Sequence, residues 1–254
     1  MNEHISEMVQ YGLIGRSLRH SYSEKYFKSK FSQLQLKNHD YHLFEMNDVN
    51  EIRSWAKDIE GLRGLNVTIP FKTSILEYLD EIDPIAKKVG AVNCIKIRNK
   101  HWKGFNTDVI GFDKTIDAIL KLSNKTEIKT ALVLGSGGSS KAVQWVLTNR
   151  NIAFKIVSRQ KKKAFLSYKE VTADLVQNFE LIVNCTPVGM YPDEAHCPEI
   201  PYMDLGRKHL LIDLIYNPEK TLFLTLGARR TFFYMNGMLM LEAQAEASWN
   251  IWNE

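Results

Sequence analysis

The segment Gly135-Ser136-Gly137-Gly138-Ser139 follows an apolar run at 130–134 and precedes a helix-compatible run. This order of strand, glycine turn and helix is what a dinucleotide-binding unit requires. In such a unit Gly135 permits the tight turn and Gly137 lets the backbone approach a pyrophosphate, whose charge faces the free N–H groups of the helix start. Ser140 stands at the third glycine position of the G-x-G-x-x-G pattern, so an ordinary glycine turn before a helix is the alternative interpretation.

A second predicted strand, at 153–157, is followed by Ser158 and Arg159 and then by three lysines at 161–163. In an NAD site the end of this strand offers an acidic residue to the ribose hydroxyls, whereas an arginine there suits a 2′-phosphate. Because the acid is missing and cations are present, the sequence favours NADP over NAD. For Lys161 and its neighbours a solvated helix start is the alternative, so Arg159 is the stronger candidate.

Polar side chains also follow the apolar segment 62–67, which is predicted to be a strand. Pro70, which has no N–H to donate, ends the strand pairing there. Ligands of open α/β sheets bind beyond the carboxyl ends of strands, so Asn66, Thr68 and Lys72 are candidates for ligand contact. A single lysine is usually a solvated surface residue, and this interpretation of Lys72 stays open.

Two further polar pairs lie where helices are predicted to begin. Ser21 and Ser23 precede a helix predicted over 24–36, and Thr107 and Asp108 precede a helix that runs to residue 122. The structural interpretation of each pair is helix capping, which the spacing favours. The functional interpretation of the serines is that two hydroxyls at a helix start hold an anion such as a carboxylate.

The elements that must position these residues alternate between strands and helices along the chain, which predicts an α/β protein. Strands are expected at 11–15, 40–46, 62–67, 90–97, 102–105, 130–134, 153–157, 181–183, 209–215 and 230–234. Helices are expected at 24–36, 49–59, 77–89 (in two pieces around Pro84), 108–122, 141–147, 221–226 and 238–252, and a proline-containing loop at 191–202.

Composition excludes several classes of function. The net charge is +4 with 24% charged residues, and no basic stripe is interleaved with aromatic residues, which argues against nucleic acid as a partner. No apolar run reaches the length of a membrane span, and the N-terminal residues do not resemble a signal peptide. The 3 cysteines are widely spaced, which argues against a disulfide framework and a metal site and indicates a reducing, cytoplasmic compartment.

Taken together, short motifs along nearly the whole chain resemble the shikimate dehydrogenase family. Each motif is weak alone, but their joint order and spacing are specific. The motifs are His20-Ser21-Tyr22-Ser23, Asn66-Val67-Thr68-Ile69-Pro70-Phe71-Lys72, Gly90-Ala91-Val92-Asn93, Asn106-Thr107-Asp108 with Gly111, the turn at Gly135, Asn184-Cys185-Thr186-Pro187-Val188-Gly189-Met190, Tyr216-Asn217-Pro218, and Gly237 with Gln244.

The resemblance implies a fold and an activity. The implied fold is an N-terminal α/β substrate domain at 1–107, a Rossmann-type NADP-binding domain at 108–235, and a C-terminal helix at 236–254 that returns to the substrate domain. The implied activity is the reversible, NADPH-dependent reduction of 3-dehydroshikimate to shikimate, on the route to chorismate and the aromatic amino acids. The implied partners are small molecules, with neither nucleic acid nor membrane, and the implied assembly is a monomer or homodimer.

The resemblance also assigns roles by position. Lys72 matches the catalytic lysine and Asp108 its partner. The residues that match substrate-binding positions are Ser21, Ser23, Thr68, Asn93, Asp108, Tyr216 and Gln244. The residues that match cofactor-binding positions are Gly135, Ser136, Gly137, Gly138, Ser139, Ser158, Arg159, Lys161, Thr186, Met190, Ile215 and Gly237. No position matches a metal ligand.

The chain departs from the family pattern at several of these motifs. Glu24 replaces the usual proline after Ser23, and Cys94 replaces the usual threonine after Asn93. Serines replace common alanines in the glycine turn. The segment Ser158-Arg159-Gln160 replaces Asn-Arg-Thr, which keeps the arginine but predicts weaker affinity for the 2′-phosphate.

Three alternatives remain beside the leading hypothesis. One is a quinate/shikimate dehydrogenase of broader cofactor use, against which the missing acid after the second strand of the dinucleotide unit argues. Another is a non-catalytic regulator that binds NADP or shikimate, against which the retained Lys72 and Asp108 argue. The last is a structural α/β protein, which does not explain polar residues at several strand ends.

Overall fold

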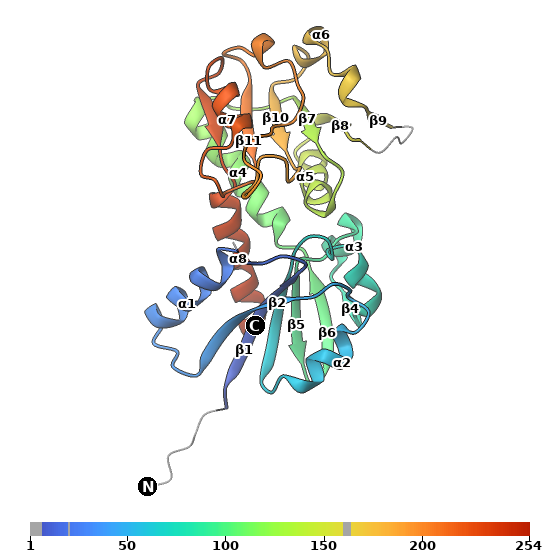
Figure 1. Ribbon diagram of the computed structural model, residues 1–254, viewed down its shortest axis with the longest axis vertical. Coiled ribbons are helices and arrows are strands. Elements are labelled where there is room, and N and C mark those ends of the chain that lie inside the picture. Colours follow the sequence, from blue (N-terminus) through green and yellow to red (C-terminus); the bar gives the residue numbers. More distant parts are fainter. Residues whose placement is uncertain (1–6, 20, 160–163) are drawn as a thin grey trace. The chain divides into compact units, whose positions relative to one another are not determined.

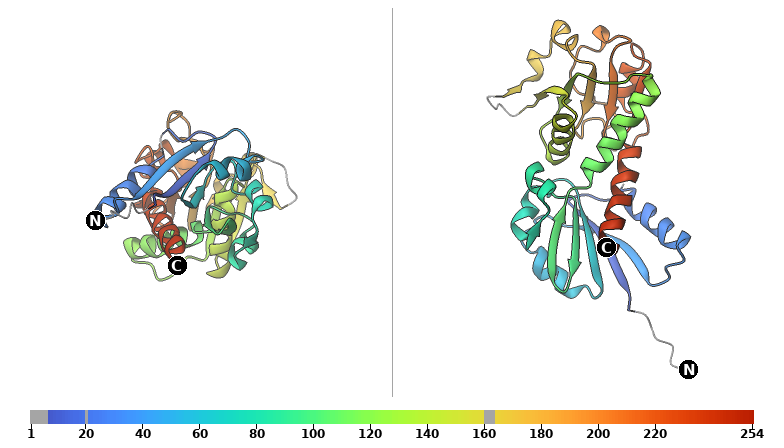
Figure 2. Two further views of the ribbon diagram at one scale, coloured as in Figure 1. Left: turned by 90° about the horizontal axis from the view of Figure 1, so that it is seen from below. Right: turned by 180° about the vertical axis from the view of Figure 1, so that it is seen from behind.

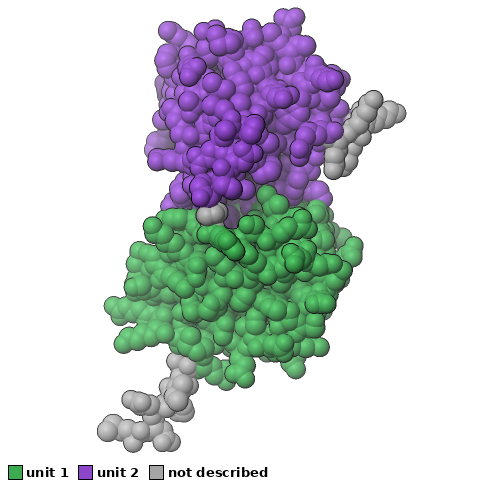
Figure 3. Space-filling model, in the orientation of Figure 1, with its two compact units in different colours: residues 1–107, 245–254 green, residues 108–244 purple. Residues whose placement is uncertain are grey.

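A computed structural model describes residues 7–19, 21–159 and 164–254 of the chain. The chain divides into two compact units (Figure 3). Unit 1 contains residues 1–107 and 245–254, and unit 2 contains residues 108–244. The second division falls inside the last helix, so the two ends of that helix belong to different units.

Unit 1 is built on a mixed sheet (Figure 1). Its strands lie in the order β2-β1-β3-β5-β6-β4, in which β2, β1 and β3 are parallel and β5 is antiparallel to both β3 and β6. Asn99 and Lys100 both have positive φ values in the turn that joins β5 to β6, as the tight hairpin requires. The strands are β1 (Val9–Gly15), β2 (His39–Glu45), β3 (Leu62–Val67), β4 (Glu81–Ile82), β5 (Cys94–Arg98) and β6 (His101–Phe105).

Helices cover both faces of the unit 1 sheet (Figure 2). One face packs against α1 (Ser23–Gln33) and the C-terminal part of α8 (Met238–Asn253), where Phe27 and Trp252 are buried against Tyr41. The other face packs against α2 (Ile52–Trp55) and α3 (Pro84–Val89). β3 is buried at every residue except Arg63, as expected of a strand covered on both faces.

Unit 2 contains a wholly parallel sheet in the order β12-β11-β10-β7-β8-β9. The chain runs from β7 through β8 to β9 and then returns to the other side of β7, so the strand order reverses between β7 and β10. In open α/β sheets a reversal of this kind marks the crevice in which dinucleotides bind. The strands are β7 (Thr130–Leu134), β8 (Ala153–Val157), β9 (Phe165–Leu166), β10 (Leu181–Asn184), β11 (Leu210–Asp213) and β12 (Phe233–Met235).

The helices of unit 2 pack on this sheet and on one another. Helix α5 (Gly138–Asn149) packs on β7 and β8, and α4 (Asp108–Ser123) packs on α5 and β12. Helices α6 (Ala173–Val176) and α7 (Leu222–Gly227) contribute Val176 and Phe223, respectively, to a core on one face of the sheet. The central strands β10 and β11 are buried along their whole length.

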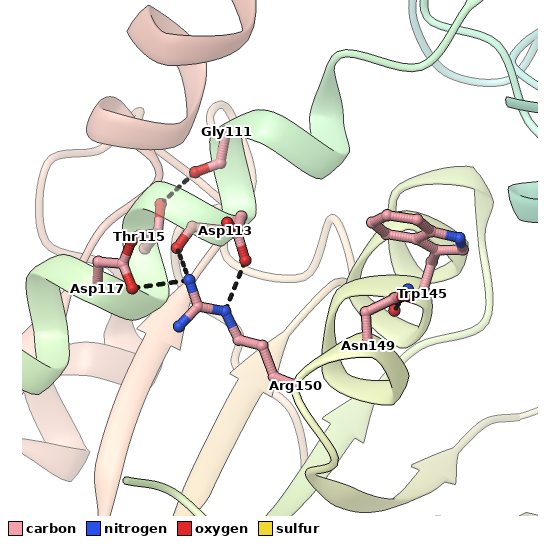
Figure 4. A network of polar contacts seen from close by, with 7 residues as sticks. All are labelled: Gly111, Asp113, Thr115, Asp117, Trp145, Asn149 and Arg150. Atoms are coloured by element: carbon pink, nitrogen blue, oxygen red, sulfur yellow. Dashed lines mark hydrogen bonds and ion pairs between the residues drawn. The ribbon is translucent and has the colours of Figure 1, made fainter. Parts of the chain in front are cut away.

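Arg150 links α5 to α4 (Figure 4). Its Nε donates to Asp113 Oδ1 at 2.6 Å, and its Nη2 donates to the Asp113 carbonyl at 3.1 Å and to Asp117 Oδ1 at 2.7 Å. The hydrogen bond to the Asp113 carboxylate is the main reason that the pKa of Arg150 lies above its usual value. Because both carboxylates are more than half exposed, at 51% and 64%, solvent screening limits the contribution of these pairs to about 1 kcal/mol or less.

The expected fold class is confirmed, but several expected elements are wrong in detail. The helix expected over 49–59 is only the short α2 followed by a 3-10 turn at Ala56–Asp58. The helix expected over 77–89 is a 3-10 turn at Ser74–Tyr78, the edge strand β4 and then α3. Asp83 is extended before Pro84 and caps α3 by accepting from Ile85 N and Ala86 N, which explains why the helix begins only there.

Further segments differ from expectation. The strand expected over 90–97 is β5, which begins only at Cys94, and the helix expected over 24–36 is α1, which ends at Gln33. The final strand of unit 2 begins at Phe233 rather than Arg230. The elements between β8 and β10, namely β9, a 3-10 turn at Tyr168–Glu170 and α6, were not predicted, because a two-residue strand and a four-residue helix are too short to show periodicity. Within the described residues, no helix is both long enough and apolar enough to span a bilayer.

Candidate functional site

Unit 1 brings several of the predicted substrate-binding residues to the carboxyl end of β3. The Val67 N–H donates to the Asn93 carbonyl at 2.9 Å, and the Thr68 N–H donates to the Ile14 carbonyl at 2.9 Å. One turn further on, the Lys72 carbonyl accepts from Val92 N at 2.8 Å. The segment that carries Thr68 and Lys72 is therefore tied to the segment that carries Asn93 by two backbone hydrogen bonds, Val67 to Asn93 and Val92 to Lys72.

The side chain of Asn93 fixes the segment that leads into α4. Its Oδ1 accepts from the Thr107 N–H at 2.6 Å, and its Nδ2 donates to Thr107 Oγ1 at 2.9 Å. Both residues are buried, and the Thr107 hydroxyl also lies 3.2 Å from Ser248 Oγ of α8. Asp108, which follows Thr107 directly, is the first residue of α4 and is 3% exposed.

A buried polar network that sequence reasoning missed supports these groups. The Tyr41 hydroxyl donates to Asn66 Oδ1 at 2.9 Å, and Asn66 Nδ2 donates to Ser248 Oγ at 2.9 Å and to the Asn93 carbonyl. Burial raises the pKa of Tyr41 well above its usual value, and a hydrogen bond with the Ser23 side chain opposes that rise. The network thus connects Ser23 to Asn93 through Tyr41 and Asn66. Tyr41 lies in an ordinary alternating strand, so its sequence context carries no sign of this role.

The serines at the start of α1 do not act as expected from the capping interpretation. The N-cap residue is Tyr22, it makes no side-chain capping bond, and Ser23 is the first helical residue. The Ser21 Oγ accepts from the Ser23 N–H at 3.2 Å. The interpretation of Ser23 as the N-cap is therefore wrong, because its side chain is buried against Tyr41 instead.

In unit 2 the glycine turn lies directly beyond β7, at the point where the strand order reverses. Gly137 is the N-cap of α5, with no side-chain capping bond, and Gly138 and Ser139 begin the helix. Ser140 is buried, and its hydroxyl donates to the Gly135 carbonyl at 2.8 Å. A serine at the third position of the motif therefore closes the turn by a hydrogen bond.

The two key glycines of this turn have different surroundings. Gly135 has a φ of +104°, and a Cβ built there would lie 2.9 Å from Thr186 Cγ2 and 3.2 Å from the Cys185 carbonyl. Gly137 has a φ of −75°, and a Cβ built there would meet no atom within 4 Å. Gly135 is therefore needed by the fold, whereas the space in front of Gly137 is open to a ligand.

The end of β8 carries the predicted 2′-phosphate contacts. Ser158 Oγ lies 3.0 Å from Ser136 Oγ in the glycine turn, so the turn and the strand end are joined by a hydroxyl pair. Arg159 is exposed. Its charge acts on Tyr168: burial raises the pKa of Tyr168 to about 12, and the Arg159 charge opposes that rise. Lys161 lies outside the described residues.

The remaining predicted cofactor residues follow β10 and β11. Thr186 donates from both its N–H (3.0 Å) and its hydroxyl (2.7 Å) to Asn184 Oδ1. The Ile215 carbonyl accepts from Gly237 N at 2.9 Å. Met190 is 42% exposed. Its carbonyl accepts from Asp193 N at 2.9 Å, at the start of the loop expected over 191–202.

Each unit thus gathers its own set of predicted residues. In unit 1 hydrogen bonds link Ser23 to Asn93 through Tyr41 and Asn66, and bonds of the chain neighbours Val67 and Val92 bring Thr68 and Lys72 near Asn93. In unit 2 Ser136 contacts Ser158, Ile215 is bonded to Gly237, and Thr186 lies against Gly135. Asp108, Tyr216 and Gln244 belong to unit 2, so their meeting with Lys72 remains a prediction. Among the described residues, no group of His, Cys, Asp and Glu side chains is arranged to hold a metal ion.

Comparison with known proteins relates this chain to one family. Residues 13–95 match the profile described as "Shikimate dehydrogenase substrate binding domain". The chain is 38% identical to the shikimate dehydrogenase (NADP(+)) of Methanococcus maripaludis, over 95% of this chain and 90% of that protein. The chain belongs to the shikimate dehydrogenase family.

Solved structures of the shikimate dehydrogenase family share the fold. Shikimate dehydrogenase 1 of Peptoclostridium difficile superimposes with a TM-score of 0.83 and 36% identity, over 97% of this chain and 92% of that one. The shikimate 5-dehydrogenase of Thermus thermophilus, solved in complex with NADP(H) and shikimate, gives a TM-score of 0.83 and 26% identity, over 96% and 93% of the two chains.

The departures from the shikimate dehydrogenase pattern are accommodated locally. Glu24 pairs with Lys28 one helical turn later, at 2.8 Å. Cys94 is fully buried, and burial raises its pKa to about 12, so it behaves as an unreactive core residue. Ser136 and Ser158, which both replace other residues of the pattern, contact each other, so these two departures form one structural feature.

Proposed function

We propose that this protein is an enzyme that reduces 3-dehydroshikimate to shikimate with NADPH and catalyses the reverse reaction with NADP⁺. The observation that carries the proposal is the 38% identity to a shikimate dehydrogenase (NADP(+)) over 90% of its length. The parallel sheet with a glycine turn at its point of reversal supports the dinucleotide, because this is where such sheets bind one.

The residues of unit 2 fit NADP. The open space in front of Gly137 and the positive end of the helix dipole at the start of α5 would take the pyrophosphate. Gly135, Ser136, Gly138, Ser139, Ser158, Arg159 and Lys161 would hold the adenosine half, and Thr186, Met190, Ile215 and Gly237 the nicotinamide half. When bound, the reduced cofactor supplies the hydride.

The residues around β3 fit the substrate. Two hydroxyls, of Ser21 and Ser23, would hold its carboxylate together with Tyr216. Thr68, Asn93, Asp108 and Gln244 would bind the ring hydroxyls and the reacting oxygen. Asn93 is oriented for this by its bonds to Thr107, which leave its position independent of a ligand.

Lys72 and Asp108 would carry the proton chemistry. Hydride delivery to a carbonyl builds negative charge on its oxygen, which an ammonium within hydrogen-bond reach stabilises and protonates. A neighbouring carboxylate orients the lysine and favours its charged form. The pairing is supported by connectivity: Val92 binds the Lys72 carbonyl, the adjacent Asn93 binds Thr107, and Asp108 comes next in the chain.

A matrix of substrates and cofactors tests the function. Purified protein with shikimate and NADP⁺ is expected to produce reduced cofactor, seen as a rise in its absorbance, with quinate and NAD⁺ as the comparison arms. No turnover of shikimate with NADP⁺ at any pH from 6 to 10 would reject the proposal. Higher kcat/KM with quinate and NAD⁺ would instead support a quinate dehydrogenase, and tight binding without turnover a regulator.

The glycine turn gives a matched pair of variants. We expect Gly137→Ala to leave the free energy of unfolding within about 0.5 kcal/mol of the parent and to raise the Kd for NADP⁺, because the new methyl occupies the pyrophosphate space. We expect Gly135→Ala to lower the free energy of unfolding by about 1–3 kcal/mol, because its φ is +104° and the methyl meets Thr186. Denaturant unfolding and NADP⁺ titration measure the two effects, and unchanged affinity in Gly137→Ala would contradict the placement of the pyrophosphate.

The substrate domain is assigned to residues 1–107, the cofactor domain to 108–235 and the returning helix to 236–254. The enzyme acts in the cytoplasm, which its free cysteines Cys94, Cys185 and Cys197 support. It acts as a monomer or homodimer on small molecules.

A further inference from the structure

A buried carboxylate lies at the centre of the strand ends in unit 2 and has no part in the chemistry described above. Asp213 is the last residue of β11 and is fully buried. Its register partner on the neighbouring strand is Asn184, the last residue of β10. The two side chains therefore lie at the same edge of the sheet as the glycine turn that follows β7.

Both oxygens of Asp213 accept hydrogen bonds. Oδ1 accepts from Asn184 Nδ2 at 3.0 Å and from the Ile215 N–H at 3.0 Å. Oδ2 accepts from Thr221 Oγ1 at 2.5 Å. Thr221 in turn caps α7 by accepting from Leu224 N. One carboxylate thus joins β10, the segment after β11 and the start of α7.

These partners lead directly to the residues proposed to hold the cofactor. Asn184, oriented by Asp213, accepts both hydrogen bonds from Thr186, and the Thr186 hydroxyl accepts from Val188 N at 3.3 Å. On the other side, Ile215 is held by its N–H to Asp213. The Ile215 carbonyl then accepts from Gly237 N.

The cost of burying this carboxylate argues that it is retained for more than stability. A buried charge is expensive unless it is paired with a cation, and an apolar replacement is often neutral or stabilising. Among the described residues, burial and hydrogen bonds set the pKa of Asp213: burial raises it to about 6 in spite of the hydrogen bonds from Thr221, Ile215 and Asn184. A carboxylate that is buried in this way at a cost in stability is expected at a functional site.

The strand order indicates which half of the cofactor lies near Asp213. The glycine turn and Arg159 follow β7 and β8, on one side of the reversal, and Asp213 lies among residues that follow β10 and β11, on the other side. A dinucleotide lies across the reversal, with one mononucleotide on each half of the sheet. We propose that Asp213 is a positioning residue that holds Thr186 and Ile215 in place for the nicotinamide half of NADP; this inference rests on the proposed function.

Two ligands, variants of Asp213 and one control variant test this role. NADP⁺ spans both halves of the sheet, whereas 2′-phospho-ADP-ribose, which is NADP⁺ without the nicotinamide ring, relies on the glycine turn and Arg159. We expect Asp213→Ala to raise the Kd and KM for NADP⁺ by about 10- to 100-fold, because buried donors lose their acceptor. We expect its Kd for 2′-phospho-ADP-ribose and its KM for shikimate to stay within about twofold of the parent.

The conservative variant separates position from charge. In Asp213→Asn, Oδ1 still accepts from Asn184 and Ile215, and the new amide donates to the Thr221 hydroxyl, so we expect most of the NADP⁺ affinity to return. Asp174→Ala, which removes an exposed carboxylate of α6, is the matched control and is expected to change neither Kd. Asp213→Ser, which keeps one acceptor, replaces Asp213→Ala if that variant does not fold.

The outcomes are distinguishable. Equal weakening of both ligands would show that Asp213 only supports the fold of unit 2 and would overturn the inference. Unchanged affinity for NADP⁺ in a folded Asp213→Ala or Asp213→Ser protein would overturn it as well. A parent protein that neither binds NADP⁺ nor oxidises shikimate would instead reject the proposed function, before any variant is compared.

Discussion

Replacing Lys72 by alanine is expected to lower kcat for shikimate oxidation by about 10²–10⁴-fold, the usual contribution of a positioned proton-transfer group. The KM for shikimate is expected to change much less, because the carboxylate and ring hydroxyls of the substrate would still be bound by Ser21, Ser23 and Asn93. Steady-state kinetics in the direction of NADP⁺ reduction measures both constants. Near-normal turnover by Lys72→Ala would remove Lys72 from the catalytic role.

The chain supplies a control and a way to separate two roles of the amine. Lys88→Ala removes an exposed ammonium in the last turn of α3 and is expected to leave kcat unchanged. Lys72→Arg keeps the positive charge, but a guanidinium does not release its proton in proteins. Partial activity in Lys72→Arg would identify electrostatic stabilisation as the main contribution, whereas loss as complete as in Lys72→Ala would identify proton transfer.

Replacing Arg159 by alanine is expected to raise the KM for NADP⁺ by about 10- to 100-fold, since a charge-assisted hydrogen bond contributes about 1.5–3 kcal/mol. The KM for NAD⁺ is expected to change by less than about threefold, because NAD⁺ has no 2′-phosphate to lose this contact. Arg159 is exposed at the end of β8, next to the hydroxyl pair of Ser136 and Ser158.

The ratio of the two effects is the measurement that matters. Lys121→Ala, an exposed cation near the end of α4, controls for a general loss of positive charge from unit 2 and is expected to change neither KM. If Arg159→Ala weakens NADP⁺ and NAD⁺ equally, the assignment of Arg159 to the 2′-phosphate is wrong. Increasing salt should weaken NADP⁺ binding more in the parent than in Arg159→Ala, because screening acts on the same contact.

Local patterns carried much of the prediction. The run 130–134, the glycines after it and the run 153–157 fall where β7, the turn and β8 lie in the structure. Strands buried on both faces are apolar along their length, and glycine and proline mark the ends of such runs in any context. The candidate residues at these ends could therefore be named from the chain alone.

The structure decided what depends on residues far apart in the chain. The antiparallel pairing of β5 with β3, the Tyr41–Asn66–Ser248 network and the Asn184–Asp213–Thr221 cluster join segments whose spacing shows no pattern. A hydrogen bond between two strands depends on register and sheet order, which are set by packing over the whole unit. For this reason Asp213 reads in the sequence as an ordinary polar residue after an apolar run, and its role becomes visible only when β10 and β11 are placed side by side.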